Sequence, residues 1–360
     1  MNISVGIVGL PNVGKSTLFN ALLKQQVALA ANYPFATIEP NVGIAQVPDS
    51  RLQPLADLVH TSVLKPATVE FVDIAGLVKG ASTGEGLGNQ FLSHIRETAA
   101  ICHVLRAFTD DEIIREGAVS PKDDLETIRT ELELADLSTL SKQSQPKGAV
   151  STEQKERWET IVKFKEAIEA GTMINTLELS DPEREVAKEL NLLTAKAEIF
   201  AINIDEGRLT ESPTLTESFA KEIGVPQESI VVVSAKIESE LSTLNEADQQ
   251  EYMKELGIQK SGLERLAETA YKTLHLQSFL TAGELEVRAW TIKVGTTAQH
   301  ASGAIHTDFV KKFIKANIVH YEDFLANNGW KGVREAGKMR IEGKEYVMRD
   351  GDVVEFMIGS

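Results

Sequence analysis

The residues with the clearest chemical potential form a glycine-rich string near the start of the sequence. It reads Gly9-Leu10-Pro11-Asn12-Val13-Gly14-Lys15-Ser16 and fits the pattern G-x-x-x-x-G-K-[ST]. An apolar run ends at Val8 and a helical pattern begins at about Lys15, so both flanking elements of a P-loop are expected. The backbone N–H groups of such a loop bind phosphate oxygens, and the start of the helix adds partial positive charge. We therefore predict a binding site for a nucleoside triphosphate.

Two side chains of this loop have distinct predicted roles. Lys15 is expected to bring a full positive charge to the β- and γ-phosphates, and the hydroxyl of Ser16 is expected to bind Mg²⁺. The complete set of residues predicted to hold the phosphates is Asn12, Val13, Gly14, Lys15, Ser16 and Thr17.

A second metal ligand is predicted after another apolar run, in the string Asp73-Ile74-Ala75-Gly76. An acid at the carboxyl end of a strand, at the same sheet edge as the P-loop, can hold Mg²⁺ through water. The N–H of Gly76 can meet the γ-phosphate. The alternative interpretation of Asp73 is an acid that caps a strand in a turn.

Two loops are predicted to complete the γ-phosphate side of the site. Thr37 lies between Pro34 and Pro40 and is the candidate for a further Mg²⁺ ligand, which would act together with oxygens of the nucleotide. Glycines at 80, 84, 86 and 88 make the stretch after Gly76 conformationally permissive. Such a segment can convert the nucleotide state into a change of shape, and a flexible surface loop is the alternative.

Composition restricts the class of protein. The chain has 360 residues, of which 42% are apolar and 25% charged, as in a soluble globular protein with two domains, or three if one is small. The single cysteine, Cys102, excludes a disulfide framework within the chain. The net charge of −16 argues against broad, nonspecific coating of DNA. Without a long apolar run or a basic leader, a cytoplasmic location and no membrane partner are expected.

Six short β-branched runs must position these residues. They are nearly continuous apolar runs, as is typical of strands covered on both faces. Helical stretches between several of them predict an α/β fold, a mostly parallel sheet with helices on both sides. The runs are 5–8, 42–44, 69–72, 101–105, 199–202 and 230–233.

Two further segments differ from this pattern. Residues 121–190 contain two amphipathic helices around a break at Pro146 and Gly148, which predicts a helical hairpin or short coiled coil that serves as a packing arm or binds a partner. Residues 277–360 carry 11 basic and 11 acidic residues and a pattern of strands around one helix, at about 307–315, which suggests a small α+β fold of the β-grasp type. The predicted domains are 1–275, with the insertion at about 121–190, and 277–360.

The motifs together resemble a known family. The P-loop, the Thr37 loop and the Asp73–Gly76 turn are similar to the G1, G2 and G3 motifs of a Ras-like, translation-factor-class G domain. The whole chain resembles the YchF subfamily of the Obg-related P-loop GTPases, the Obg-like ATPases. This resemblance implies a Ras-like P-loop G domain with an inserted α-helical hairpin and a C-terminal β-grasp TGS domain. The strings that carry it are 6–17, 32–41, 84–89, 279–290, 305–309 and 335–338.

The choice of base is predicted from two strings. A guanine-specific site usually has N-K-x-D, but the fifth apolar run is followed by Asn203-Ile204-Asp205-Glu206, which leaves guanine donors poorly paired at a cost of about 1–3 kcal/mol. This suggests relaxed guanine selection, and the family resemblance implies a preference for ATP over GTP. Glu206 as a solvated acid at a strand end is the alternative. A G5-like string follows the next strand, so the predicted base-binding residues are Asn203, Ile204, Glu206, Ser234, Ala235 and Lys236.

Hydrolysis is expected to be slow. Ras-like enzymes commonly orient the attacking water with a glutamine after the D-x-x-G turn, where this chain has Leu77. His94 is a weak candidate for positioning water, His103 is expected in the core, and Arg115 replaces a histidine of many relatives. The predicted catalytic residues are Lys15, Thr37, Gly76 and His94.

Three functions are compatible with these residues. The first is a Mg²⁺-dependent switch enzyme that hydrolyses ATP, the second a GTPase of the same fold, and the third a ribosome- or protein-binding regulator whose hydrolysis is incidental. The resemblance implies association with the ribosome or its large subunit. Contact with RNA is possible through the C-terminal segment, where Lys311, Lys312 and Lys315 are expected on a helix and Trp330 in a loop.

Overall fold

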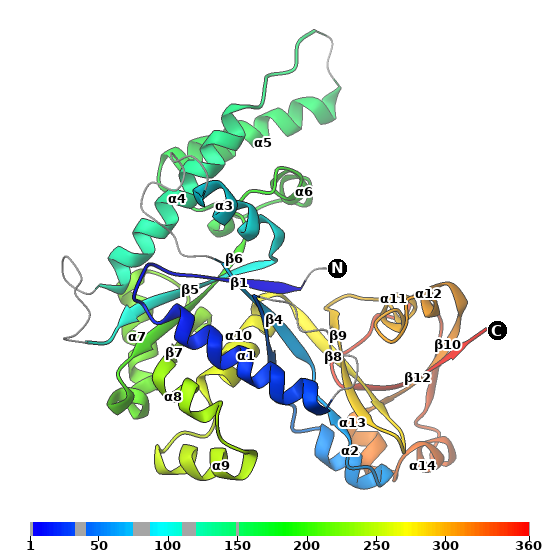
Figure 1. Ribbon diagram of the computed structural model, residues 1–360. Helices are drawn as coiled ribbons and strands as arrows, with labels where there is room; N and C mark the ends of the chain where they lie inside the picture. The colour runs from blue at the N-terminus through cyan, green and yellow to red at the C-terminus, as the bar shows by residue number, and fades with distance from the viewer. Residues whose placement is uncertain (1–2, 33–40, 75–86, 110–119, 149–150, 360) are drawn as a thin grey trace. The chain divides into compact units, whose positions relative to one another are not determined.

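The computed structural model describes residues 3–32, 41–74, 87–109, 120–148 and 151–359 (Figure 1). The chain divides into two compact units, the first formed by Met1–Ile44 and Glu70–Thr269 and the second by Ala45–Val69 and Ala270–Ser360. The sequence analysis assigned all residues before about 275 to one domain, whereas the structure groups Ala45–Val69 with the C-terminal part of the chain. This grouping depends on contacts between residues far apart in sequence, which local patterns do not record.

The first unit is built on a six-stranded sheet of order β2-β4-β1-β5-β6-β7. Strand β1 pairs in parallel with β4 and β5, and β6 pairs in parallel with β5 and β7. The prediction of six strands in a mostly parallel sheet is confirmed. The strands are β1 (Ser4–Val8), β2 (Val42–Gln46), β4 (Thr68–Asp73), β5 (Ala100–Ala107), β6 (Ala197–Ile204) and β7 (Ile230–Val233).

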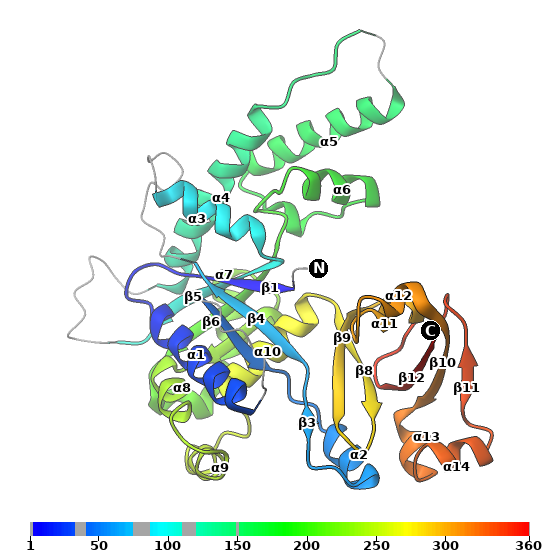
Figure 2. The ribbon, with the colours of Figure 1, turned by 45° about the vertical axis from the view of Figure 1, so that its right-hand side comes forward.

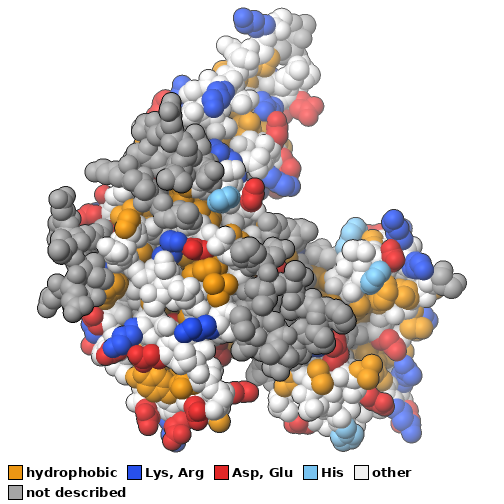
Figure 3. Space-filling view, viewed as in Figure 1, with side chains coloured by type: hydrophobic (Ala, Val, Ile, Leu, Met, Phe, Trp, Pro, Cys, Tyr) orange, Lys and Arg blue, Asp and Glu red, His pale blue; other side chains and the backbone are white. Residues whose placement is uncertain are grey.

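Helices pack against this sheet (Figures 1 and 2). Helix α1 (Lys15–Asn32) packs beside α8 (Ala235–Leu241), whereas α4 (Pro121–Ser141) and α7 (Ser212–Ile223) share an apolar cluster with β5 and β6. In the space-filling view acidic side chains gather over α9 (Figure 3). The other helical elements are α3 (Leu87–Glu97), η2 (Glu206–Glu211), η3 (Gln227–Ser229), α9 (Glu246–Glu255) and α10 (Gly262–Thr273).

The inserted segment forms the predicted pair of helices. Helix α4 begins after Ser120, whose side chain accepts a hydrogen bond from the N–H of Asp123, and the next helix, α5 (Thr152–Glu169), begins with a capping box between Ser151 and Gln154. The segment then continues through η1 (Ile174–Thr176) and α6 (Asp181–Glu189). Apolar side chains from α4, α5 and α6 form a small core of their own, which includes Leu140, Phe164 and Val186.

The second unit contains a sheet of order β11-β10-β12-β8-β9-β3. Strand β12 is parallel to β8 and antiparallel to β10, and β8 and β9 form an antiparallel pair. The prediction of one helix over about 307–315 was too long: α12 ends at Lys312, and Lys315 lies on β10 opposite Met357. The strands are β3 (Leu64–Lys65), β8 (Leu276–Ala282), β9 (Val287–Lys293), β10 (Phe313–His320), β11 (Arg340–Glu342) and β12 (Asp352–Ile358).

Short helices complete this unit: α2 (Leu52–Val59), α11 (Ala298–Ser302), α12 (Phe309–Lys312), α13 (Tyr321–Ala326) and α14 (Trp330–Glu335). The helix was predicted too long because the run from Phe313 to Val319 is compatible with the periodicity of a helix and with that of a strand. Pairing with β12 makes it a strand. Among the helices of the described chain, none has the length and apolarity needed to cross a membrane.

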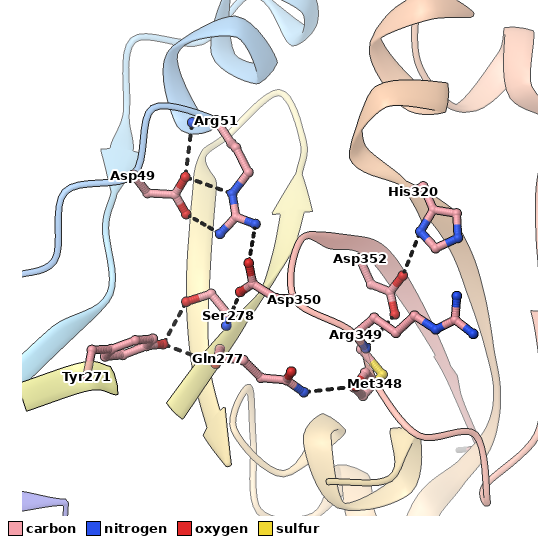
Figure 4. A network of polar contacts seen from close by, with 10 residues as sticks. All are labelled: Asp49, Arg51, Tyr271, Gln277, Ser278, His320, Met348, Arg349, Asp350 and Asp352. Carbon is pink, nitrogen blue, oxygen red and sulfur yellow. Dashed lines mark hydrogen bonds and ion pairs between the residues drawn. The ribbon is translucent and has the colours of Figure 1, made fainter. Parts of the chain in front are cut away.

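Polar contacts attach the Ala45–Val69 segment to the rest of the second unit (Figure 4). The Arg51 guanidinium donates to both carboxylate oxygens of Asp49 at 2.8 Å and to Oδ2 of Asp350 at 2.7 Å. The other oxygen of Asp350 accepts from the N–H of Ser278 at 2.9 Å. Gly351 has φ +79°, and a Cβ there would lie 2.6 Å from a nitrogen of Arg51, so glycine is required for this approach.

Candidate nucleotide-binding site

The P-loop has the backbone that its glycines predict. Asn12 and Gly14 adopt positive φ angles of 64° and 91°. A Cβ on Gly14 would lie 2.2 Å from Nδ2 of Asn203, so this position excludes every side chain. Helix α1 follows directly, with its N–H of Leu18 bonded to the carbonyl of Gly14 at 3.0 Å. The first N–H groups of a helix have no partner within the helix, so the start of α1 is a place where phosphate oxygens can be bound.

Lys15 and Asp73 form a direct ion pair between Nζ and Oδ1. The parallel pairing of β1 and β4 places Ile7 opposite Asp73, which brings the end of β4 to the start of the P-loop. The Lys15 side chain is 10% exposed and that of Asp73 24%. In a partly buried position each charge needs the other, so an arriving phosphate would compete with Asp73 for Lys15.

The oxygen donors predicted for Mg²⁺ are of the type that this cation prefers. Ser16 and Thr17 are exposed at the start of α1, and the Asp73 carboxylate is partly exposed at the end of β4. The residues present thus fit a magnesium ion held together with nucleotide oxygens. Thr37 and Gly76, with Leu77 and Arg115, lie outside the described residues.

Asn203 joins the P-loop to the start of α8, which follows β7. Its side-chain amide donates from Nδ2 to the carbonyl of Val13 at 3.0 Å and accepts through Oδ1 from the N–H of Ala235 at 2.9 Å. The residue is only 5% exposed. Three of the predicted strings, at the ends of β1, β6 and β7, are therefore brought together at one edge of the sheet, where parallel α/β sheets bind ligands.

The remaining predicted base-binding residues differ in exposure. Ile204 and Ser234 are each 2% exposed, and Ile204 belongs to the apolar core of the unit, so only its backbone remains for a ligand. Glu206 and Lys236 are much more exposed and form an ion pair at 2.7 Å. The negative charge of Glu206 is therefore already balanced by the positive charge of Lys236.

Comparisons with known proteins agree with this arrangement. A family model described as 50S ribosome-binding GTPase matches residues 4–134, and a model named YchF-GTPase_C, described as a protein of unknown function, matches residues 276–359. The Ribosome-binding ATPase YchF of Bacillus subtilis is 49% identical over 99% of this chain and 99% of that protein. This chain belongs to the YchF family. The family prediction made from the sequence is confirmed.

Other YchF-family proteins give the same result. The Ribosome-binding ATPase YchF of Escherichia coli O157:H7 is 48% identical over 99% of both chains. The solved structure of the Schizosaccharomyces pombe YchF GTPase matches with a TM-score of 0.87 and 39% identity, covering 99% of this chain and 98% of that one. These relatives are named ATPase in two cases and GTPase in the third, so their names leave open which base this YchF-family chain prefers.

His94, the candidate for positioning water, and His103, expected in the core, occupy different environments. His94 is exposed in the last turn of α3, and in the described chain it makes no hydrogen bond or ion pair. His103 is fully buried on β5, stacks on Phe200 and has Nε2 2.9 Å from Oε1 of Glu198. Its buried position agrees with the expectation for His103, while no described contact connects His94 to the P-loop of this YchF-family protein.

Glu198 belongs to a buried polar cluster that the sequence did not reveal. Burial alone would raise its pKa, but the contacts with His103 and Arg129 outweigh that effect and lower the pKa to about 2. Arg129 donates to both carboxylate oxygens, at 3.2 and 2.7 Å, and Asn175 donates to one of them at 3.1 Å. This cluster fixes α4 and the segment after α5 to β6, and therefore anchors the inserted hairpin.

Glu238 is a second buried acid that the sequence analysis missed. Burial raises the pKa of Glu238 to about 7, although its carboxylate accepts from the N–H groups of Gly262 at 2.7 Å and Leu263 at 3.2 Å. It lies on α8, two residues after Lys236, and its partners begin α10. The only sequence signal was the spacing of Ser261 and Glu264, which predicts a helix start at α10.

Proposed function

We propose that this chain is a P-loop ATPase that binds and slowly hydrolyses ATP with Mg²⁺, acts as a nucleotide-controlled switch and associates with the ribosome. The observation that supports this proposal most directly is the position of Asn203, whose amide links Val13 of the P-loop to Ala235. This link holds a phosphate-binding loop and a base-binding edge in one rigid arrangement. The full-length similarity to proteins named Ribosome-binding ATPase YchF supports both the chemistry and the partner.

The roles of the residues follow from phosphoryl-transfer chemistry, in which a protein mainly positions groups and stabilises charge. The P-loop N–H groups and Lys15 hold the triphosphate, and Lys15 exchanges its carboxylate partner Asp73 for phosphate oxygens. Ser16, Asp73 and Thr37 are the residues that would hold Mg²⁺. When bound, this ion neutralises charge that develops on the β- and γ-phosphate oxygens.

Slow turnover is part of the proposal. The position after the D-x-x-G turn is Leu77, which has no group to orient water. His94, Thr37 and the N–H of Gly76 are the remaining candidates on this chain for the γ-phosphate side. A partner that supplies or orders a catalytic group would then accelerate hydrolysis, as arginine fingers do in related chemistry.

The base preference separates the main proposal from a GTPase of the same fold. The relative from S. pombe is named a GTPase, which favours the second function, whereas the replacement of N-K-x-D by Asn203-Ile204-Asp205-Glu206 favours the first. Calorimetric titration of the purified chain with ATP and GTP, with and without Mg²⁺, tests both. Binding of ATP that is tighter than that of GTP and depends on Mg²⁺ is expected, and a clear preference for GTP would contradict the ATPase assignment.

Ribosome association is tested by sedimentation with purified 70S ribosomes and separated subunits, in the presence of ATP, ADP or no nucleotide. Cosedimentation with the large subunit that changes between ATP and ADP is expected of a switch. Equal cosedimentation in all three states would favour a binding protein whose hydrolysis is incidental. No cosedimentation in any state would contradict the proposed partner.

A further inference from the structure

Two exposed side chains of opposite charge meet at the base-binding edge. Glu206 begins η2 directly after β6, and Lys236 lies in the first turn of α8 directly after β7. Strands β6 and β7 are parallel neighbours with Asn203 opposite Val233, so the residues that follow them emerge side by side. The Lys236 ammonium lies 2.7 Å from Oε2 of Glu206.

The backbone that carries this pair is held in place. Asn203 accepts from the N–H of Ala235, the residue before Lys236, at 2.9 Å. The same Asn203 is three residues before Glu206 and donates to the P-loop. The pair is therefore fixed relative to the P-loop through one buried side chain, even though its own members are 66% and 49% exposed.

Among the described residues Lys236 has one ion-pair partner, Glu206, and Glu240 adds a weaker charge interaction. The nearby acid Glu240 accepts from the hydroxyl of Tyr252 at 2.6 Å, which raises the pKa of Tyr252 to about 12. Lys236 has its pKa raised first by the hydrogen bond to Glu206 and then by charge interaction with the same acid. Lys236 therefore stays protonated at neutral pH, and its positive charge interacts with the Glu206 carboxylate.

The two bases make opposite demands on this carboxylate. Guanine presents the N1–H and the exocyclic amine, two neighbouring donors that are best satisfied by an unengaged carboxylate. Adenine presents an acceptor at N1 beside its amine, so it can donate to only one oxygen of such a carboxylate, and its N1 is repelled by the other. A glutamate already paired with an ammonium has to give up part of that interaction to receive guanine, because one ammonium and two base donors compete for the same oxygens.

We propose that Lys236 is a specificity-determining residue, which favours ATP over GTP by engaging the Glu206 carboxylate at the base-binding edge. This inference rests on the proposed nucleotide-binding function and deepens it. Lys236 acts on base choice through Glu206, and not through the phosphates. The size of the effect is limited by the exposure of the pair, since exposed ion pairs change equilibria by about fivefold or less.

The test is a double-mutant cycle on the full chain. Dissociation constants for ATP and GTP are measured by calorimetry for the wild type, Lys236→Met, Glu206→Gln and the double variant, at low and at high salt. Lys236→Met keeps the aliphatic stem and removes the charge. We expect the GTP-to-ATP ratio of dissociation constants to fall about two- to fivefold in Lys236→Met at low salt, to fall less at high salt, and to stay unchanged when Lys236→Met is added to Glu206→Gln.

A matched control is available in the same unit. Lys221 pairs with Glu217 at 2.6 Å on α7, with both side chains exposed, and Lys221→Met should leave the ratio unchanged. The inference is overturned if the GTP-to-ATP ratio of dissociation constants does not change in Lys236→Met, or if it changes equally when Lys236→Met is added to Glu206→Gln. In both cases the proposed ATPase function stands. A wild-type chain that binds neither nucleotide contradicts the inference and the proposed function together.

Discussion

The Arg51 guanidinium lies 2.7 Å from the Asp350 carboxylate, although 299 positions separate the two residues in the sequence. Both belong to the second compact unit. Arg51 lies in the Ala45–Val69 segment, which connects β2 to Asp73 through the second unit. Most of the chain between the predicted Thr37 and Asp73 ligands, residues 45–69, therefore belongs to the second unit, whereas the residues next to both ligands belong to the first.

Replacing Arg51 should loosen the segment. In Arg51→Ala the carboxylates of Asp49 and Asp350 lose a shared partner, and we expect the unfolding free energy of the second unit to fall by about 1–2 kcal/mol, because the site is only partly buried. Urea denaturation measures the loss, and hydrogen exchange should show faster exchange in Ala45–Val69. Arg349→Ala, which changes a neighbouring arginine that does not contact Asp49, is the control. Unchanged exchange in the segment would contradict the anchoring role.

Lys15→Ala should abolish ATP hydrolysis and weaken ATP binding, because the loop then lacks the full charge that opposes the phosphates. Phosphate release and calorimetry measure the two effects. Lys24→Ala changes an exposed lysine on the same helix and should leave both unchanged. Hydrolysis that survives in Lys15→Ala would show that the P-loop is not the reaction site.

The sequence predicted the elements of the first unit well because its signals are local. The P-loop glycines and the apolar strands each specify their own structure, and both are present. The end of α12 was not predictable, since Phe313–His320 becomes a strand only by pairing with β12. The contact between Arg51 and Asp350 was not predictable either, because 299 positions separate the two residues and no spacing rule connects them.

In the candidate site, too, some features could be predicted from the sequence and others could not. The strings at the ends of β1, β6 and β7 could be identified because motif spacing is local, and the strand order then brings them together. The links between them could not: Asn203 contacts Val13 and Ala235 only after folding, and Lys236 meets Glu206 across two strand ends. Buried acids such as Glu238 were missed because a glutamate in an amphipathic helix is normally assigned to the solvent face.

Gly14→Ala should eliminate nucleotide binding. The new Cβ would lie 2.2 Å from Nδ2 of Asn203 in a backbone with φ +91°, so either the loop or the Asn203 link must move. Gly171→Ala is the matched control, because Gly171 also has a positive φ, of +71°, but no atom lies within 4 Å of the added Cβ. Thermal melts with and without ATP should show a loss of ATP stabilisation in Gly14→Ala only. Equal ATP stabilisation in both variants would contradict the proposed contact.

Glu238 should make stability depend on pH in a predictable direction. The pKa of Glu238 is about 7 in the folded protein and near the ordinary glutamate value of 4.5 in the unfolded chain, so the folded state binds the extra proton. Stability from this group is complete below about pH 4.5 and is lost as the pH rises to about 7, with an upper limit of about 3 kcal/mol. Urea midpoints at pH 5 and pH 7.5 measure the change.

Glu238→Gln keeps an acceptor for Gly262 but cannot ionise, so its midpoint should fall less over this interval than that of the wild type. Glu246→Gln, an exposed acid on α9, should behave as the wild type does. If the urea midpoints of the wild type and of Glu238→Gln changed equally with pH, the Glu238 carboxyl would ionise equally easily in the folded and the unfolded chain.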